Sequence, residues 1–470
     1  MPPKLNPLVE LIPVRIISLR DRLRAGLWEE RQDLPVSISP VTDMIHSVSA
    51  AAGLWYQPIQ PGAHFGQPFG EWQQCWFRVE VPPAAPAQAG RRYFFWDCRG
   101  ETTAYIDDKP WAGLDVAHPY CILPDSACTL WLDCGTYQTC IWYEGAKEID
   151  EYGLRFDGAW IAARSLAAWE TFWDLDVLVH WMEYLLKRDG LGEMIRPWGP
   201  YPSPRKAHPV LRKLLGMLDE AYMAYESGGL AALSPALKRI YAAFPAETWQ
   251  PVVKMVGHSH LDLVWMWPEV EGERKAVHTI ATALRLLDEY PQYRFMWTSP
   301  ASMQLLEERF PALYAEVKEQ LRLGRWETTG GAWVEFDTLI ACGEALGRSL
   351  VMGQRKFSEL RGSPSTTVWL PDCFGFNGFL PQIMAQAGIR NFCTTKLSWS
   401  VVTDFAYDSF IWRAADGSEV ITHLNVKAPS WEGIPGLAEA AEHYRQLDVH
   451  NEILKSNGVG DGGGGTTVAA

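Results

Sequence analysis

The sequence contains no CxxC pair, no run of 18 apolar residues and no internal repeat. Without paired thiolates at that spacing, a cysteine-ligated zinc site is not expected. Without a long apolar run, no segment is expected to span a membrane. Basic residues are fewer than acidic ones, 42 against 56, so the formal net charge is −14. Because nucleic acids are bound by basic faces, this balance argues against a nucleic-acid partner.

The N-terminal segment also lacks the features of an export signal. Glu10 and Arg15 interrupt the short apolar stretch near the start of the chain, and a signal peptide needs a longer apolar core. The nine cysteines are scattered, with six of them between Cys75 and Cys140. In a chain without an export signal, reduced thiols are expected there rather than a disulfide framework. We therefore predict a cytoplasmic protein.

Aromatic residues, in contrast, are abundant. The chain has 23 Trp and 17 Tyr, within a composition of 47% hydrophobic and 21% charged residues that is typical of a folded globular protein. Aromatic faces stack on sugar rings, so this content favours a carbohydrate ligand. Any single Trp is nevertheless more often a core or interface residue.

Four parts follow one another along the chain, at 1–44, 45–160, 161–250 and 251–470. The first is a partly helical lead-in. The second has short aromatic and β-branched runs, such as CWFRVEV and RRYFFWDC, divided by Pro and Gly clusters, and this pattern predicts a β-sandwich. The third repeats apolar residues at three- and four-residue spacing, which predicts a helical connector.

Strand-like and helical segments alternate in the fourth part. One predicted helix presents Ala276, Ile280, Ala283 and Leu287 on one face, and others are ASMQLLEERFPALYAEVKEQLR, residues 343–361 and FLPQIMAQAG. Repeated strand–helix units imply a parallel sheet, open or closed into a barrel. The predicted strands are PVVKMVG, YRFMWTS, RWETTGGAWVE, TTVWLPD, NFCTT, VITHLNV and KSNGVGD.

Polar residues stand at the carboxyl ends of these strands, where parallel α/β folds collect their functional groups. Glu335 and Asp337 follow the third strand, and His260 and Asp262 follow the first. Two positions apart in extended backbone, His260 and Asp262 face the same way and make a suitable zinc ligand pair. An isolated pair of this kind is also compatible with a hydrogen-bonded His and a helix-capping Asp.

Two further carboxylates end other strands. Asp372 precedes a turn with Gly375, where it could be a metal ligand, a nucleophile or a helix cap. Asp461 precedes four glycines, which let a backbone approach a ligand closely; the loop lacks the Gly-Lys-Ser/Thr ending of a nucleotide-binding loop. Two carboxylates on different strand ends are what retaining glycoside hydrolysis needs, one as nucleophile and one as acid/base.

The motifs GHSHLDLVWMWP, GRWETTGGAWVEFD, VWLPDCFGFNGFLPQI, TTKLSWS and GVGDGGGGTT occur in an order and spacing that resemble family 38 α-mannosidases, above all the cytosolic branch. The segment FGQPFGEWQQCWFRVEVP resembles that branch's N-terminal β-domain, so the resemblance covers nearly the whole chain. It implies a seven-stranded α/β barrel with one zinc ion, other divalent metals occurring in the family. It also implies retaining hydrolysis of terminal α-mannosides through a covalent mannosyl-enzyme, with a mannose-containing oligosaccharide as substrate.

The resemblance implies a role for each matching residue. His260, Asp262 and Asp372 would bind the metal, Asp372 would also be the nucleophile, and Asp461 is the candidate acid/base. The residues implied to contact substrate or support the site are Trp265, Lys396, His258, Trp333 and Asp337.

Family members continue well beyond this length, and their fourth metal ligand is a His from that later part. We therefore expect 251–470 to be a C-terminally truncated barrel whose exposed apolar surface pairs with C-terminal domains or with another copy of the chain. Two alternatives stay open. The chain could be an inactive or carbohydrate-binding fragment without the fourth ligand. It could also be a metal-dependent polysaccharide deacetylase, although the HxxxH pair expected of that class does not occur.

Overall fold

The computed structural model describes residues 11–45, 47–66, 72–136, 153–192, 207–245, 251–425 and 433–468. The chain divides into two compact units. One unit comprises Met1–Arg31, Ala162–Gln250 and Glu432–Glu442, and the other comprises the remaining residues. Cys140 and residues 67–71 of the β-domain motif lie outside the described residues.

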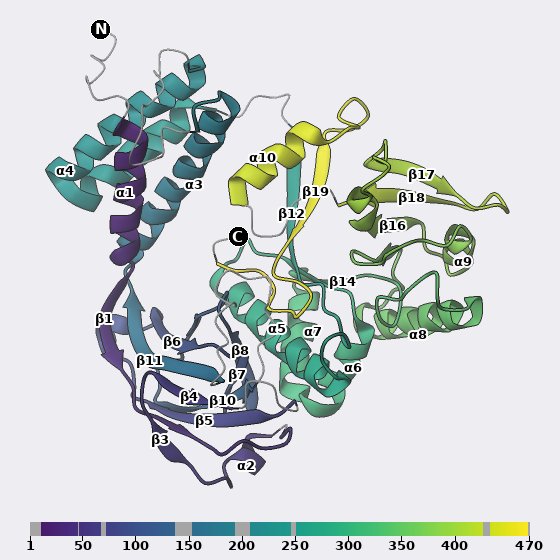
Figure 1. The fold of residues 1–470 in the computed structure, drawn as a ribbon, viewed down its shortest axis with the longest axis horizontal. Helices are drawn as coiled ribbons and strands as arrows, with labels where there is room; N and C mark the ends of the chain where they lie inside the picture. The colour runs from purple at the N-terminus through teal and green to yellow at the C-terminus, as the bar shows by residue number, and fades with distance from the viewer. Residues whose placement is uncertain are drawn as a thin grey trace. The chain divides into compact units, whose positions relative to one another are not determined.

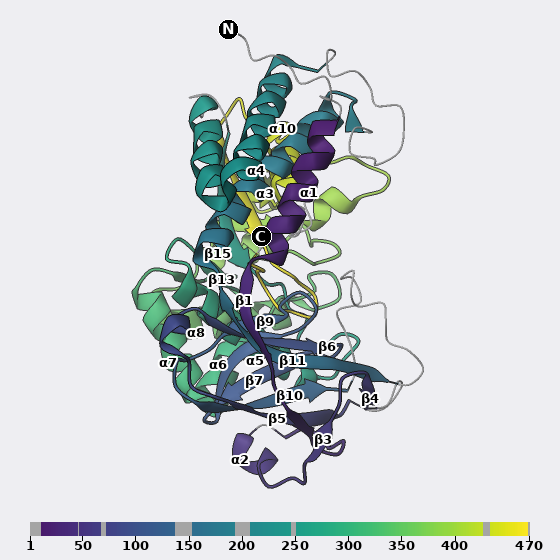
Figure 2. The ribbon, with the colours of Figure 1, turned by 90° about the vertical axis from the view of Figure 1, so that its left-hand side faces the viewer.

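The first unit is built from long helices packed side by side (Figures 1 and 2). Buried Leu19, Phe172 and Leu215 belong to its apolar interior. Gly229 has φ 61° and kinks the longest helix, because only glycine adopts this conformation without steric cost. The helices are α1 (Ile12–Ala25), α3 (Leu166–Arg188), α4 (Pro209–Ala243) and most of α10 (Gly433–His443).

A β-rich part, most of it in the second unit, holds two stacked sheets, as the strand pattern predicts. The six-stranded sheet has the order β3-β2-β5-β10-β7-β8, and the five-stranded sheet has the order β1-β11-β6-β9 with β4 paired to β11. Their strands are β1 (Trp28–Asp33), β2 (Val36–Ile38), β3 (Gln57–Ile59), β4 (Ala63–Phe65), β5 (Gln74–Val81), β6 (Arg92–Cys98), β7 (Thr102–Ile106), β8 (Lys109–Leu114), β9 (Tyr120–Ile122), β10 (Cys128–Gly135) and β11 (Leu154–Arg164).

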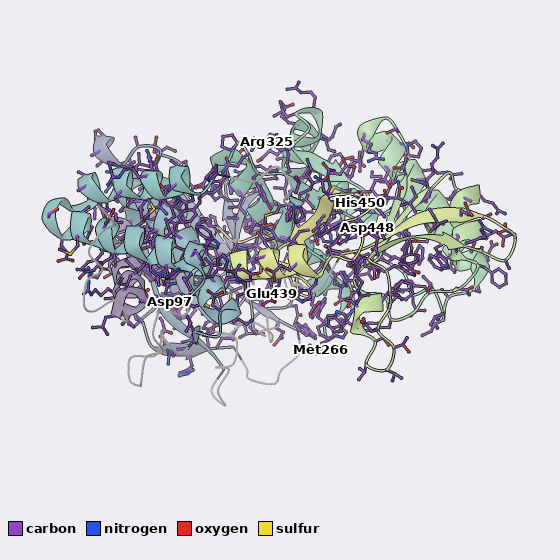
Figure 3. The ribbon with its side chains drawn as sticks, turned by 90° about the horizontal axis from the view of Figure 1, so that it is seen from above. Asp97, Met266, Arg325, Glu439, Asp448 and His450 are labelled. Atoms are coloured by element: carbon purple, nitrogen blue, oxygen red, sulfur yellow. The ribbon has the colours of Figure 1, made fainter. Side chains whose placement is uncertain are left out.

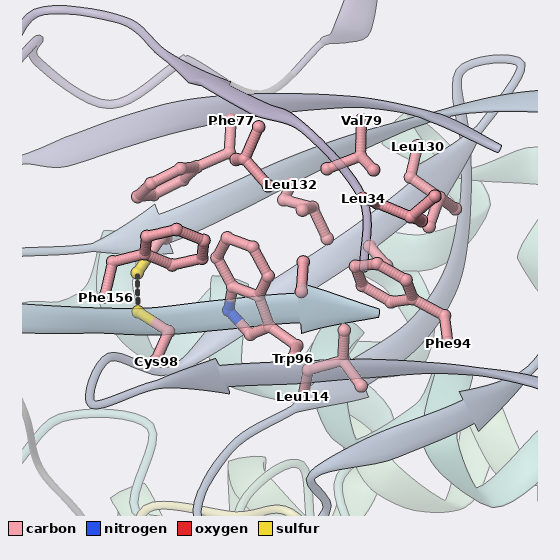
Figure 4. Close-up of a cluster of buried hydrophobic side chains, with 14 of the residues drawn as sticks. Leu34, Phe77, Val79, Phe94, Trp96, Cys98, Leu114, Leu130, Leu132 and Phe156 are labelled. Atoms are coloured by element: carbon pink, nitrogen blue, oxygen red, sulfur yellow. Dashed lines mark hydrogen bonds between the residues drawn. The ribbon is translucent and has the colours of Figure 1, made fainter. Parts of the chain in front are cut away.

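Aromatic and aliphatic side chains from both sheets fill the space between them (Figure 4). Phe77 meets Trp96 edge to face with ring centroids 5.0 Å apart, a favourable aromatic geometry. The thiols of Cys98 and Cys134 lie 3.9 Å apart in this core without a covalent bond. All cysteines among the described residues are free.

The outer face of the six-stranded sheet is also buried. Trp76 and Tyr105 pack there against helix α5 (Glu269–Glu289), together with the adjoining α2 (Val48–Ala51). The residues predicted to share one face of this helix, from Ala276 to Leu287, are all buried in the same cluster. The β-rich part therefore shares a hydrophobic core with the α/β part of the chain.

All seven strands predicted for the α/β part are present, and they lie in two four-stranded sheets. The sheet orders are β14-β13-β12-β19 and β15-β16-β18-β17, and every pair is parallel except β17 with β18. The strands are β12 (Val252–His258), β13 (Phe295–Trp297), β14 (Trp326–Thr328), β15 (Thr367–Trp369), β16 (Asn391–Thr394), β17 (Ser409–Arg413), β18 (Glu419–Leu424) and β19 (Glu452–Asn457).

The two sheets are joined on one side by a single parallel bridge between Gly330 and Val368. On the other side the Asn425 side chain donates to Ser456 Oγ at 2.6 Å, and no backbone ladder joins β18 to β19 among the described residues. The mixed α/β fold is confirmed, whereas the described strands do not form the closed seven-stranded barrel that the resemblance implies.

Helices cover the strands. Residues 343–361 are helical as predicted, but the single helix expected over 301–322 is two helices that meet at Pro311. Proline has no N–H to donate and clashes with the preceding turn, so it begins the second helix instead of continuing the first. Among the described helices, none combines the length and apolarity needed to cross a membrane. The helices that cover the strands, besides α5, are α6 (Pro300–Arg309), α7 (Pro311–Arg322), α8 (Gly343–Arg361), α9 (Leu380–Gln386) and the 3₁₀ turn η5 (Lys396–Trp399).

Candidate metal and catalytic site

Four side chains from three strand ends converge at one edge of the α/β part. His260 and Asp262 follow β12, Asp372 follows β15 and Asp461 follows β19. Each offers one ligand atom, and these atoms lie within 4.8 Å of one another. Because parallel strands end at a common edge, residues far apart in sequence meet there. One imidazole with three carboxylates is a donor set suited to a divalent cation.

Backbone pairing between two loops brings His260 and Asp461 together. Leu261 forms an isolated bridge with Gly462, and the Asp262 N–H donates to the Asp461 carbonyl at 3.0 Å. Asp461 itself has φ 54°, a left-handed conformation that aspartate tolerates better than most residues. Strained backbone of this kind gathers at functional sites.

The imidazole of His260 lies among carboxylates, with both ring nitrogens buried. Its Nε2 lies 3.4 Å from Asp262 Oδ1 and 3.5 Å from Asp372 Oδ2, and its Nδ1 lies 2.6 Å from Glu335 Oε2. Neither ring nitrogen makes a hydrogen bond of regular geometry. Burial alone would lower the pKa of His260, but Glu335, Asp262 and Asp372 outweigh it and raise the pKa well above 6.5. A site that holds so much negative charge around one imidazole fits a cation.

Glu335 was visible at a strand end but was not assigned a role by the resemblance. Its Oε1 accepts a hydrogen bond from Thr298 Oγ1 at 2.9 Å, while Oε2 faces His260 Nδ1. A carboxylate on one nitrogen of a histidine fixes the ring and leaves the other nitrogen for a metal. The signal in the sequence was the alternation after β14, which directs Glu335 and Asp337 to the same side in extended backbone.

Asp337 lies elsewhere. It is exposed, and its Oδ1 accepts hydrogen bonds from the N–H groups of Leu339 at 2.7 Å and Ile340 at 2.6 Å. These contacts stabilise a turn. The structure thus brings Glu335, rather than Asp337, to the cluster.

Asp372 forms an ion pair with Lys396, through Oδ1 and Nζ. Burial raises the pKa of Asp372, but His260 and Lys396 outweigh it and the net pKa is below the usual 3.8. The Lys396 ammonium also lies 3.4 Å from the ring centroid of Trp399 and 4.6 Å from that of Phe374, so two cation–π contacts hold it in place. Asp372 is therefore kept ionised, as a nucleophile or metal ligand must be.

Asp461 has the opposite electrostatic character. Its pKa is raised above 3.8, mainly by burial and further by the negative charges of Asp372 and Asp262. Two carboxylates whose environments push their pKa values apart are the arrangement that separates an acid from a nucleophile.

The remaining predicted residues surround the cluster. His258 is buried; its Nδ1 donates to the Met296 carbonyl at 3.1 Å, and its Nε2 accepts from Trp369 Nε1 at 3.2 Å. Burial lowers the pKa of His258 to about 4, so this ring is neutral with both nitrogens engaged. Trp265 is 45% exposed and packs edge to face on Trp267 at 5.4 Å, which leaves ring surface available.

Trp333 is half-buried and is tied by its backbone to α8, since its N–H donates to the Ser349 carbonyl at 2.9 Å.

A cavity of 620 Å³ opens next to Lys396. Its wall is mainly aromatic and includes Phe374, Phe376, Phe392, Trp399, Phe410 and Trp412.

Strand-end carboxylates beside an aromatic cavity are compatible with a glycoside hydrolase. Residues 250–470 match the family described as "Glycosyl hydrolases family 38 N-terminal domain". Over these residues the chain is therefore similar to glycosyl hydrolase family 38.

Curated relatives include α-mannosidase G of Dictyostelium discoideum, 35% identical over 235 residues, or 50% of this chain and 22% of that protein. Human α-mannosidase 2C1 is 29% identical over 441 residues, 88% of this chain and 39% of its own. The α-mannosidase of Saccharomyces cerevisiae is 28% identical over 441 residues, 86% of this chain and 38% of its own. The chain thus spans between about a fifth and two-fifths of these relatives.

Among solved structures, an α-mannosidase from Enterococcus faecalis V583 is 21% identical with a TM-score of 0.37, covering 46% of this chain and 26% of that one.

Proposed function

We propose that the site hydrolyses terminal α-mannosides with retention at the anomeric carbon. The observation that carries this proposal is the juxtaposition of Asp372, ionised beside Lys396, with Asp461, whose pKa is raised. An oxygen of each lies within 4.8 Å of the other. Retaining enzymes place their carboxyl groups about 5–5.5 Å apart and inverting enzymes about 6.5–9.5 Å apart, so the separation supports retention.

In this proposal Asp372 attacks the anomeric carbon and forms a covalent mannosyl-enzyme. Asp461 gives its proton to the leaving oxygen and later takes one from the water that releases mannose, in the two-step scheme of retaining enzymes. Trp265 offers a ring face for the sugar. Glu335 keeps the His260 ring oriented through Nδ1, and His258, held between Met296 and Trp369, supports the end of β12.

One zinc ion, or another divalent metal, would be held by His260, Asp262 and Asp372, and the convergent oxygen of Asp461 supports a fourth contact. When bound, such an ion supplies Lewis-acid stabilisation of the negative charge that develops on substrate oxygens. Asp461 is thus a candidate both for the acid/base and for a metal ligand. A mannose-containing oligosaccharide as substrate, association with other copies or domains, and a cytoplasmic location belong to the same proposal.

The test is Asp372→Asn, with Asp448→Asn as the control at an exposed carboxylate outside the site. Asp372→Asn is expected to lower turnover of an aryl α-mannoside by at least about 10³-fold, and Asp448→Asn to leave it within about twofold. A proton NMR time course should show α-mannose as the first product. β-Mannose appearing first would refute retention. Sugar binding that is unaffected by Asp372→Ala, without turnover in the unmodified chain, would replace hydrolysis by binding alone.

A further inference from the structure

Helix α5 presents polar side chains to the β-sandwich, and they are buried. Arg274, Lys275, His278 and Thr282 are all less than 8% exposed. Thr282 Oγ1 accepts the Gly113 N–H at 2.9 Å, and His278 Nε2 lies 3.0 Å from Asp115 Oδ2. Buried polar groups cost free energy unless they are paired, so this face of the helix is specified for contact with β8 and the turn that follows it.

The turn after β8 reaches the loop that carries Asp461. His118 Nε2 lies 3.1 Å from the Thr466 carbonyl, and its Nδ1 lies 3.0 Å from Asp115 Oδ1. A carbonyl only accepts, so Nε2 must carry a proton. Asp115 also accepts the N–H groups of Ala117 at 2.7 Å and His118 at 2.8 Å. Its carboxylate is therefore fixed from several sides, and it holds the imidazole of His118 toward the loop.

The contact and the backbone conformation both disfavour a side chain at one position of the loop. A Cβ added to Gly464, whose φ is 107°, would lie 3.1 Å from His118 Cε1 and 3.2 Å from Asp115 Oδ2. Within the run of glycines after Asp461, Gly464 thus faces the β-sandwich, whereas a Cβ added to Gly463 would lie 2.5 Å from Thr279 Oγ1 of α5. The run also has a cost, because glycine has more backbone freedom to lose than any other residue.

A loop of this composition needs external partners to stay in one conformation. Besides His118, Thr279 Oγ1 accepts the Gly464 N–H at 2.8 Å, and the Tyr293 hydroxyl donates to Thr466 Oγ1 at 2.8 Å. Thr279 and Tyr293 come from the α/β part itself. His118 is the partner supplied by the β-sandwich, and it is buried together with Asp115 and His278.

We propose that His118, supported by Asp115, is a positioning residue through which the β-sandwich holds the loop of residues 458–466 and so keeps Asp461 in the cluster with His260, Asp262 and Asp372. The effect on the loop is independent of the proposed function. Its consequence for metal binding rests on that function. The β-sandwich thereby becomes part of the active-site support.

Two nearly isosteric substitutions distinguish the two hydrogen bonds of the His118 ring, one through Nδ1 and one through Nε2. His118→Asn places an amide where Nδ1 was, so it retains the contact with Asp115 and loses the one with Thr466. His118→Gln places its amide N–H₂ where Nε2 was, so it retains the bond to Thr466 and loses the one to Asp115. Thr282→Val is the matched control, since it removes a buried hydrogen bond from the same interface without touching the loop.

The measurement is amide hydrogen exchange by mass spectrometry on peptides that cover 456–468. His118→Asn is expected to speed exchange there at least about tenfold, His118→Gln much less, and Thr282→Val not at all. Equal exchange in the Asn and Gln variants, or no change in the Asn variant, would overturn the proposal. Zinc affinity by chelator competition should fall about 10–100-fold in His118→Asn. Loosened exchange with unchanged zinc binding would refute the link to the cluster.

The outcome for the proposed function is separate. If the unmodified chain binds no zinc and cleaves no mannoside, that function fails, and the exchange experiment still decides whether His118 holds the loop.

Discussion

Asp133 lies on β10, where the β-sandwich meets helix α5. It offers a quantitative test of how the cost of burying a charge compares with the attraction to a nearby cation. The side chain is 1% exposed, its Oδ1 accepts a hydrogen bond from Gln74 Nε2 at 2.9 Å, and the Arg274 guanidinium lies 3.8 Å away. Burial raises the pKa of Asp133 from 3.8 to about 6; Arg274 opposes this shift and the negative charge of Glu271 adds to it. Arg274 is shared, because it also makes a two-bond contact with Glu271 at 2.6 and 3.0 Å.

The magnitude follows from the two pKa values. Each pKa unit corresponds to about 1.4 kcal/mol, so a change from 3.8 to about 6 makes the ionised carboxyl about 3 kcal/mol less favourable in the fold than in the unfolded chain. The folded state binds the proton more tightly. This cost is therefore present in full above pH 6, and it disappears as the pH falls toward 3.8. Asp133→Asn should remove it, with an expected gain of about 1–3 kcal/mol at pH 7.

The assay is urea unfolding at pH 5, 6 and 7, followed by tryptophan fluorescence. Asp448→Asn makes the same chemical change at an exposed position (Figure 3) and corrects for general charge effects. The gain of Asp133→Asn over this control should be largest at pH 7 and smallest at pH 5. Destabilisation at pH 7 would show that the attraction to Arg274 exceeds the burial cost, and a gain independent of pH would show that titration of Asp133 is not its source.

Two further predictions concern the core and the cluster. Trp96→Ala removes a side chain that is 2% exposed between the two sheets and should lower the unfolding free energy, measured in urea, by about 3–5 kcal/mol. Trp96→Phe should lower it markedly less. Equal losses in the two variants would mean that the indole N–H bond to Thr102, rather than the lost volume, dominates. His260→Ala should lower bound zinc, measured by elemental analysis after dialysis, at least about tenfold, and zinc at the unmodified level would remove His260 from the ligand set.

Much of the α/β part could be predicted because its strands are short apolar runs whose polar neighbours mark their ends. That pattern placed His260, Asp262, Asp372 and Asp461 at strand ends, and the structure brings them together. It could not decide whether Glu335 or Asp337 joins the cluster. The two carboxylates lie two positions apart and look alike in sequence, and only the fold shows that Glu335 faces His260.

Other features depend on contacts between distant segments. The polar face of α5 resembles a solvated helix surface in sequence, yet Arg274, Lys275 and His278 are buried because the β-sandwich covers them. Strand β17 was not predicted, since it pairs only with β18 at a sheet edge. Closure into a barrel likewise depends on whether the edge strands of the sheets pair with each other, and local periodicity does not predict such pairing.

The pairing of β12 with β19 has a consequence for the order of events during synthesis. Val252 aligns with Glu452, 200 residues later, and the two strands run side by side (Figure 1). Until β19 leaves the ribosome, β12 lacks one neighbour and His260 lacks Asp461. Contacts so distant in sequence form slowly and leave unpaired strand edges open to wrong partners meanwhile. The glycine-rich loop is translated after the strand ends that carry His260, Asp262 and Asp372, and it is thus the segment that completes the cluster.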